Sequence, residues 1–303
     1  MMNHNIIDFV RNPYLIFNWM AAKHLMDWMD DKTFLKLRYR ASFGKKLNLE
    51  HPVTFNEKLQ WLKLYNRMPE YTVMVDKVKA KDYVAKLIGA EHIIPTLGVW
   101  STTEEINFNE LPKKFVLKCN NDSGGVVICK DKQALNIEET KKFLNSRLNN
   151  NGFWYGREWP YKNIKPCIIA EKYMENNGQN ELIDYKFFCF NGQPKVVLVC
   201  SERFASNNMC KTYFDENWNL LNIMEANHRI DKEQKKPQSF EKMKTISQKL
   251  AKGMPFVRID FYEIEGSLYF GEITFFPASG LEKFKPEKWN NIFGDMIDIS
   301  KYK

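Results

Sequence analysis

Two short runs near the C-terminus decide the fold: Val257-Arg258-Ile259-Asp260 and Gly271-Glu272-Ile273-Thr274-Phe275-Phe276-Pro277. Both lie in segments rich in β-branched and aromatic residues, and the pair Glu265-Gly266 between them is typical of a tight turn. The sequence therefore predicts a β-hairpin, with one arm over residues 256–262 and the other over residues 267–274.

Four polar side chains of this hairpin could carry chemistry. Because side chains alternate along a strand, Arg258 and Asp260 share one face of the first arm, and Glu272 and Thr274 share one face of the second. Adjacent carboxylates repel each other unless a cation lies between them, and magnesium is commonly held by one or two carboxylates plus phosphate oxygens. Asp260 and Glu272 therefore predict a magnesium site, with Arg258 placed to stabilise negative charge. The alternative is a surface acid pair neutralised by lysines.

Upstream of residue 95 the chain reads as mainly helical. Apolar residues at three-and-four spacing predict helices over residues 34–40, 54–65 and 76–89. Thr54 and Glu57 have the spacing of a capping box, so we expect the second helix to begin at this pair.

Two short strands are predicted at residues 93–95 and 97–100, and from residue 115 the pattern becomes rich in strands, with helices predicted around residues 137–149 and 239–252. Asn191-Gly192 between two apolar runs is a strong hairpin signal. Residues 201–240 are polar and predict a long irregular loop that faces substrate, although a long loop without a function is the alternative. This order indicates an α+β fold. The remaining predicted strands cover residues 115–119, 126–130, 167–174, 184–190 and 195–200.

Composition narrows the class of protein without choosing a partner. The 303 residues are 44% hydrophobic and carry a formal charge of +8, which suits a globular protein with a nucleotide, an acidic polysaccharide or an anionic membrane surface as partner. A lysine-rich solvated surface is the alternative. The lysines are spread rather than striped, so nucleic-acid binding is not predicted.

The cysteines and the N-terminal stretch bear on location. Six cysteines without a CxxC pair, several in apolar runs, predict buried free thiols and a reducing cytoplasm. The apolar residues 12–22 are too few to span a bilayer. We expect a packed helix there. An interfacial helix with peripheral membrane association is the alternative, which no other feature supports.

Lys118 ends an apolar strand and precedes Asn120-Asn121-Asp122-Ser123-Gly124-Gly125. A lysine beside a glycine loop can grip phosphates, because backbone N–H groups line the anion while the ammonium neutralises it. A simple turn would also explain the two glycines. The chain has neither GxxxxGK[ST] nor GxGxxG, and its five histidines are scattered, so a Walker A loop, a Rossmann site and zinc chemistry are not predicted.

A second candidate region begins where Glu171-Lys172-Tyr173-Met174 ends another apolar strand. Exposed backbone groups there could bind an adenine edge while Met174 packs on the ring. Asp184 and Lys186 follow on one face of the next strand and offer an acceptor for ribose hydroxyls beside a cation for phosphates. A cross-strand ion pair on a solvated face is an equally common explanation.

Taken together, these pieces resemble the ATP-grasp superfamily and, from about Thr54 onward, the TupA-like ATP-grasp family of bacterial surface-polysaccharide biosynthesis. The superfamily's Glu-x-Asn-x-x-Pro-Gly ending reads Glu272 to Ala278 here, with Thr274 in place of Asn and Ala278 in place of Gly. The motifs that carry the resemblance lie at residues 54–61, 115–119, 122–125, 154–161, 169–173, 184–192 and 255–260.

The resemblance implies an ATP-grasp fold, in which two α+β subdomains clasp ATP and Mg²⁺. It implies a mainly helical region over residues 1–95, a small subdomain with the glycine-rich loop over residues 96–170, and a C-terminal subdomain with the metal site over residues 171–303. The implied nucleotide contacts are Lys77, Lys118, Ser123, Gly124, Gly125, Asp184, Lys186 and a hinge of Glu171, Lys172, Tyr173 and Met174. The implied catalytic residues are Arg258, Lys186 and Arg203, and the implied metal ligands are Asp260, Glu272 and Thr274.

By the same resemblance, the chain would join a uronic-acid carboxylate to an amine through an acyl phosphate. The acid would belong to an acidic saccharide or nucleotide-sugar, and the amine would be an amino acid or amino alcohol. Two alternatives stay open. One is a glycosyltransferase of the same pathways, although the chain has no DxD sequence on a strand end. The other is an ATP-binding protein without turnover.

Overall fold

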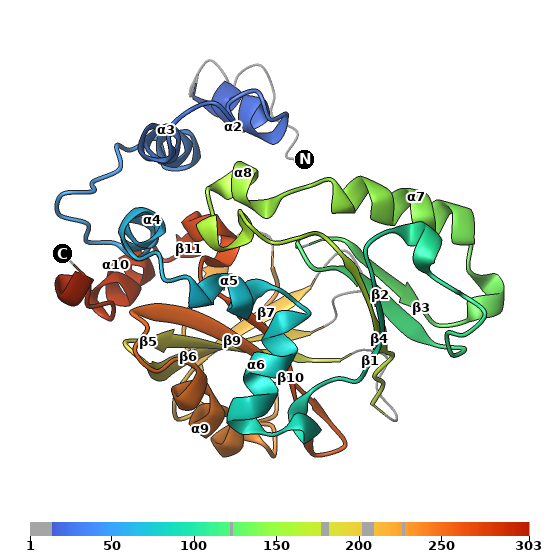
Figure 1. Cartoon of the computed structure of the whole chain (residues 1–303). Coiled ribbons are helices and arrows are strands. Elements are labelled where there is room, and N and C mark those ends of the chain that lie inside the picture. The colour runs from blue at the N-terminus through green and yellow to red at the C-terminus, as the bar shows by residue number, and fades with distance from the viewer. Residues whose placement is uncertain (1–13, 122–123, 177–181, 202–208, 226–227, 303) are drawn as a thin grey trace.

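A computed structural model describes residues 14–121, 124–176, 182–201, 209–225 and 228–302 of the chain (Figure 1). Helices and two antiparallel sheets make an α+β fold, as predicted. The helices are α2 (Leu15–Ala22), α3 (Asp31–Phe43), α4 (Phe55–Tyr65), α5 (Glu70–Val75), α6 (Lys79–Ile88), α7 (Ile137–Leu148), α8 (Gly152–Gly156), α9 (Phe240–Leu250) and α10 (Lys288–Asp295).

The smaller sheet has four strands in the order β1-β4-β2-β3. Its inner face packs on α7 around Leu117 and Leu144, both fully buried, and these residues belong to a hydrophobic core separate from the main one. The strands are β1 (Thr96–Trp100), β2 (Phe115–Cys119), β3 (Val126–Cys129) and β4 (Ile168–Lys172).

The larger sheet has five strands in the order β10-β9-β5-β6-β7, and α9 covers one of its faces (Figure 1). Phe187 and Phe240 pack between this sheet and α9, with their ring centroids 5.7 Å apart. The strands are β5 (Asp184–Phe190), β6 (Gln193–Ser201), β7 (Cys210–Asp215), β9 (Phe256–Ile264) and β10 (Ser267–Thr274), and a separate two-stranded ribbon joins β8 (Met224–Glu225) to β11 (Phe284–Lys285).

Local signals in the sequence place most elements correctly. The Thr54 hydroxyl accepts from the Glu57 N–H, and the Glu57 carboxylate accepts from the Thr54 N–H, so the predicted capping box is confirmed. Both predicted hairpins form, because Asn191-Gly192 and Glu265-Gly266 adopt the positive φ angles that such turns require.

Two predictions about secondary structure are wrong. Residues 201–240 are not a long irregular loop, since β7 completes the larger sheet and β8 pairs with β11. Cys210–Asp215 gains its strand conformation from pairing with β6, which its polar flanking residues do not reveal. Residues 93–95 are not a strand, because Ile93 makes only an isolated bridge to Phe270.

The six cysteines are all free, as predicted, and five of them are buried. In the part of the chain that the structure describes, no helix has both the length and the apolar character needed to cross a bilayer.

Candidate functional site

A cavity of about 920 Å³ is lined by residues from both sheets and from the α5–α6 segment. Its walls carry eight cationic side chains and four carboxylates, an excess that favours a polyanionic ligand. The cations are Lys77, Lys81, Lys114, Lys118, Lys130, Lys172, Lys186 and Arg258, and the acids are Glu171, Glu175, Asp260 and Glu272.

The predicted hairpin brings Asp260 and Glu272 together. They are register partners on β9 and β10, and the register shifts between Phe270 and Glu272. Gly271 occupies this irregularity, where a Cβ atom would lie 3.0 Å from the backbone oxygen of Asp260. Glycine therefore permits the close approach of the two strands that sets the carboxylates opposite each other.

Asp260 is held by two cations. The Arg258 guanidinium donates from Nε to Oδ1 and from Nη2 to Oδ2, both at 2.7 Å, and Lys186 Nζ lies 2.6 Å from Oδ2. Burial alone would raise the pKa of Asp260, but Arg258 and Lys186 outweigh burial and keep that pKa below its ordinary value. Asp260 is therefore a carboxylate at neutral pH.

Glu272 is less enclosed than Asp260. Its side chain is 45% exposed, against 4% for Asp260, and it lies 3.6 Å from Arg258 Nη2. The Thr274 hydroxyl donates to Glu272 Oε1 at 2.7 Å and accepts from Arg258 Nη2 at 3.1 Å. Loss of water inside the cavity and the nearby Asp260 carboxylate raise the pKa of Glu272. Arg258, Lys77 and Lys186 lower it by more, so the pKa of Glu272 lies below its ordinary value.

These donors fit magnesium in part. Within the described residues no group of three or more His, Cys, Asp or Glu side chains could hold a metal ion. The paired Asp260 and Glu272 could supply carboxylate oxygens to Mg²⁺, which is usually held by one or two carboxylates while phosphate oxygens and water complete its shell. The Thr274 hydroxyl lies between Arg258 and Glu272, where it orients both side chains.

A second buried carboxylate lies on the smaller sheet. Glu171 on β4 contacts Lys81 through Oε1 and Lys118 through Oε2, each at 2.5 Å. Burial raises the pKa of Glu171, but Lys118 and Lys81 together keep it below its ordinary value. The sequence interpretation missed Lys81. In the helix predicted over residues 76–89, Lys81 follows Lys77 by four residues and would share its face, and this spacing could have suggested a second cation at this wall.

The predicted hinge, Glu171 to Met174, lines the cavity throughout. The Lys172 N–H already donates to the Pro95 carbonyl at 2.9 Å. Lys114 Nζ lies 5.7 Å from the centre of the Tyr173 ring and 2.8 Å from a Glu175 oxygen. The cavity wall also contains apolar side chains from β2, β3, β10 and the segment before β1: Val116, Val126, Ile128, Ile93, Ile94 and Phe270.

The glycine-rich loop packs against α7. A Cβ atom on Gly124 would lie 2.4 Å from Arg147 Nη2, and one on Gly125 would lie 3.1 Å from the Cβ atoms of Arg147 and Cys119. Gly124 lines the cavity. Two predicted site residues, Ser123 and Arg203, lie outside the described residues.

Lys77 lies on the surface of the cavity, whereas Asp184 is buried in the protein. Lys77 lies between α5 and α6 and lines the cavity. Asp184 is 1% exposed, and its Oδ2 lies 3.5 Å from Lys186 Nζ. The structure therefore brings Lys77, Lys118, Lys186 and Arg258 to one cavity, with Asp184 buried beside Lys186.

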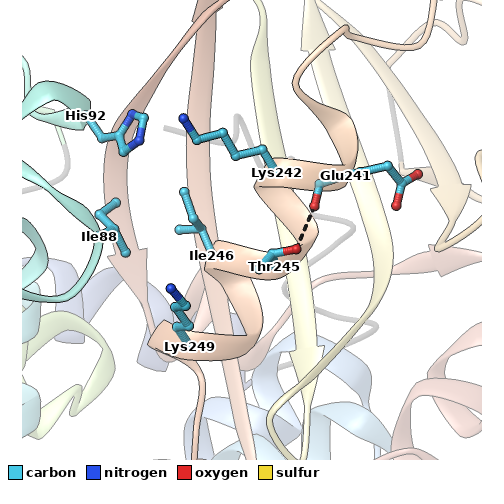
Figure 2. A pocket seen from close by; sticks show the side chains of 7 residues that line it. All are labelled: Ile88, His92, Glu241, Lys242, Thr245, Ile246 and Lys249. Atoms are coloured by element: carbon cyan, nitrogen blue, oxygen red, sulfur yellow. Dashed lines mark hydrogen bonds between the residues drawn. The ribbon is translucent and has the colours of Figure 1, made fainter.

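A smaller hollow of about 370 Å³ lies between α9 and the segment that contains the end of α6 (Figure 2). Lys242 and Lys249 reach over it from α9, and Ile88 and His92 lie opposite. Glu241 is the single carboxylate among its seven described lining residues, and Figure 2 shows it pointing away from the hollow. This hollow therefore lacks the carboxylate pair of the large cavity.

Comparison with known families assigns the chain. The profile described as TupA-like ATPgrasp matches residues 57–298, which include both sheets and the whole large cavity. The chain belongs to the TupA-like ATP-grasp family. Membership places this TupA-like protein in the ATP-grasp ligase superfamily and confirms the predicted ATP-grasp fold.

Solved structures similar to this TupA-like protein include D-alanine–D-alanine ligase from Bacillus anthracis, 20% identical over 74% of this chain and 66% of that chain, with a TM-score of 0.41. The same enzyme in complex with ATP is 16% identical over 74% and 63%, with a TM-score of 0.40. A RimK-domain ATP-grasp protein from Sphaerobacter thermophilus is 12% identical over 77% and 70%, with a TM-score of 0.41. The chain thus spans just under two thirds of the two ligase chains. No curated protein matches it.

Proposed function

We propose that this protein is an ATP- and magnesium-dependent ligase that joins a uronic-acid carboxylate to a small amine. One observation carries the proposal: a single cavity combines eight cationic side chains with a register-paired carboxylate platform, Asp260 and Glu272. The cations suit the polyphosphate of ATP, and the paired carboxylates suit a divalent cation bound to it. The acid would be part of an acidic saccharide or a nucleotide-sugar, and the amine an amino acid or amino alcohol.

The reaction would proceed in two steps. A carboxylate oxygen of the acid attacks the γ-phosphorus of ATP, the bond to the bridging oxygen breaks, and ADP leaves. The amine nitrogen then attacks the acyl carbon, phosphate leaves, and one proton is lost from the nitrogen as the amide forms. A bound Mg²⁺ would neutralise charge on the phosphates during the first step.

The chain's own residues would supply positioning and charge. Lys186 and Arg258 would face the transferred phosphoryl group, and Arg203 is proposed beside them. Lys77, Lys118 and the loop at Ser123, Gly124 and Gly125 would contact the phosphates. The wall from Glu171 to Met174 would bind adenine, and Asp184 would accept from the ribose. Asp260 and Glu272 would hold Mg²⁺, with Thr274 as their third polar neighbour.

The second candidate is a protein that binds ATP without turnover. The contacts of Asp260 favour it, because both carboxylate oxygens already accept hydrogen bonds from Arg258, and Lys186 lies on one of them. A metal ion would compete with these cations for the carboxylate.

Product formation distinguishes the two. The chain is incubated with ATP, Mg²⁺ and a panel of free and nucleotide-linked uronic acids, each with a set of amino acids and amino alcohols, and phosphate release and product mass are measured. We expect phosphate release that requires both an acid and an amine, and a product heavier than the acid by the amine minus one water. ATP binding without any such product would favour the second candidate, and the absence of ATP binding would contradict both.

A further inference from the structure

Three polar side chains of α4 are buried along one helical face. Asn56, Gln60 and Lys63 follow each other at spacings of four and three residues, and their exposed fractions are 0%, 1% and 0%. Polar residues on a helix ordinarily face water, so a buried polar stripe requires partners inside the protein. We name Asn56, Gln60 and Lys63 the α4 polar stripe.

The partners of the α4 polar stripe lie in the loop that follows β10. Asn56 Nδ2 donates to the Glu282 carbonyl at 2.8 Å, and Gln60 Nε2 donates to the Ser279 and Gly280 carbonyls at 3.1 and 2.9 Å. Lys63 Nζ donates to the Ser279 carbonyl at 2.8 Å and to its hydroxyl at 3.0 Å. The stripe thus holds three carbonyls of one short loop.

This loop has an unfavourable backbone conformation. Ala278, Ser279 and Gly280 have φ angles of 46°, 56° and 65°, three consecutive residues in the left-handed region. Ala278 and Ser279 have no glycine freedom there, so surrounding contacts must hold them in place. The loop begins at Pro277, three residues after Thr274 and five residues after Glu272, which both lie on β10.

Lys63 also contacts a second segment, the end of α8. Its Nζ donates to the Gly156 carbonyl at 2.7 Å. A Cβ atom on Gly156 would lie 2.0 Å from Ser279 Oγ, so the end of α8 and the loop after β10 are in close contact. The chain then continues from Gly156 to Tyr161, which lines the cavity. The Lys63 side chain therefore joins the two segments that flank the carboxylate platform.

We infer that Lys63, with Gln60 and Asn56, is a positioning residue that fixes the loop after β10 and thereby the orientation of Glu272 and Thr274 for metal–nucleotide binding. The four oxygen partners of Lys63 Nζ are two carbonyls, one hydroxyl and the Gln60 amide oxygen at 3.1 Å. An uncharged side chain of similar length would remove the Lys63 donor from the Gln60 amide oxygen and the Ser279 hydroxyl, and would leave the Ser279 and Gly156 carbonyls with only their longer contacts, 3.1 Å to Gln60 Nε2 and 3.4 Å to Ser279 Oγ. The functional half of this inference rests on the proposed binding of ATP with a divalent cation.

Lys63→Met tests the inference in the full chain against Met243→Ala. Met243 is fully buried on α9, beyond the opposite face of the larger sheet, so its truncation weakens the core away from the platform. Binding of ATP is measured by calorimetry with Mn²⁺ and with EDTA. We expect Lys63→Met to weaken binding of ATP with Mn²⁺ by about tenfold or more, as for residues that orient metal ligands. Its binding of ATP in EDTA and both affinities of Met243→Ala should change less than about twofold. Equal effects of the two variants, or no effect of Lys63→Met, would overturn the inference.

Hydrogen exchange separates this inference from the proposed function. Without any nucleotide, amides of residues 275–282 should exchange faster in Lys63→Met than in wild type, and Met243→Ala should leave them unchanged. If the wild type does not bind ATP, the proposed function fails while the exchange still tests the positioning role; unchanged exchange in Lys63→Met would overturn that role. If Lys63→Met does not fold, Gln60→Met is measured in its place. It removes two hydrogen bonds to the same loop and leaves the Lys63 side chain unchanged.

Discussion

Two buried carboxylates on the walls of the cavity have similar neighbours and different net charge. Glu171 on the smaller sheet lies between Lys81 and Lys118, so two cations and one acid leave one net positive charge. Asp260 on the larger sheet lies between Lys186 and Arg258, but Glu272 and Asp184, which lies 3.5 Å from Lys186, add two more acids, so two cations and three acids leave one net negative charge. The first cluster therefore suits an anion, and the second suits a cation that arrives with its own anion.

Exposure separates the two clusters as well. The Glu171 side chain is 7% exposed and both its oxygens are paired with lysines. Glu272 is 45% exposed, and it lies 3.6 Å from the Arg258 guanidinium, farther than either oxygen of Glu171 lies from its lysine. A closed triad can stabilise the sheet, whereas a carboxylate that is half open to the cavity can still bind something else.

Glu272→Gln breaks the comparison most strongly. The amide keeps the size of the side chain but removes the negative charge proposed to hold Mg²⁺, so we expect product formation from ATP, acid and amine to fall by about a thousandfold. Because Glu272 is half exposed, the melting temperature should change little. Rates come from phosphate release, and melting from circular dichroism.

Glu175→Gln is the matched control. Glu175 lines the same cavity, is 53% exposed and pairs with Lys114 at 2.8 Å, but it lies at the hinge end. We expect its turnover to stay within about twofold of wild type. A comparable loss in both variants would mean that cavity charge in general, rather than the platform, supports the reaction.

Glu171→Gln should instead affect stability more than turnover. Loss of the shared carboxylate leaves two partly buried lysines close together, so we expect the free energy of unfolding to fall by about 2 kcal/mol. Because folding lowers the pKa of Glu171, its carboxylate stabilises the protein above about pH 4.5, and this contribution is lost as the pH falls through the lowered pKa. Urea unfolding should therefore separate wild type and variant at pH 7 and bring them together near pH 3.

An exposed copy of the same arrangement provides the control. Glu241 lies 3.0 Å from Lys236 and 3.3 Å from Lys244, but its side chain is 68% exposed. Glu241→Gln should change the free energy of unfolding by less than about 0.5 kcal/mol at either pH. If Glu171→Gln were equally mild, burial would not distinguish the two triads.

The sequence predicted the platform better than the triad, for a physical reason. Asp260 and Glu272 lie on two arms of one hairpin, so alternation and a local turn are enough to pair them. The Glu171 triad joins a strand to Lys81 on a helix about ninety residues earlier, a contact that only tertiary packing creates. The bulge at Gly271 also escaped prediction, because a single glycine in a strand has several explanations.

The α4 polar stripe shows the same limit. Thr54 and Glu57 predicted the start of α4 correctly, because a capping box depends only on residues that are neighbours in sequence. Nothing local distinguishes Lys63 from a solvated lysine, because its partners Gly156 and Ser279 come from distant segments. Polar residues that are buried by tertiary contacts are therefore the part of this site that periodicity does not reveal.

Lys118→Met tests the net positive charge around Glu171, and its expected effect is the smallest of these predictions. Lys118 is 23% exposed toward the cavity and contributes to the net positive charge around Glu171, so its loss should weaken ATP binding by about tenfold, or about 1.4 kcal/mol. Calorimetry at low and high salt measures the effect, which should shrink as salt screens the remaining charges.

Lys114→Met is the control. It removes a cavity lysine that is 43% exposed and paired with Glu175, and it should weaken ATP binding by less than about threefold. Equal losses from both lysines would show that the nucleotide responds to the summed charge of the cavity and not to the closed triad at Glu171.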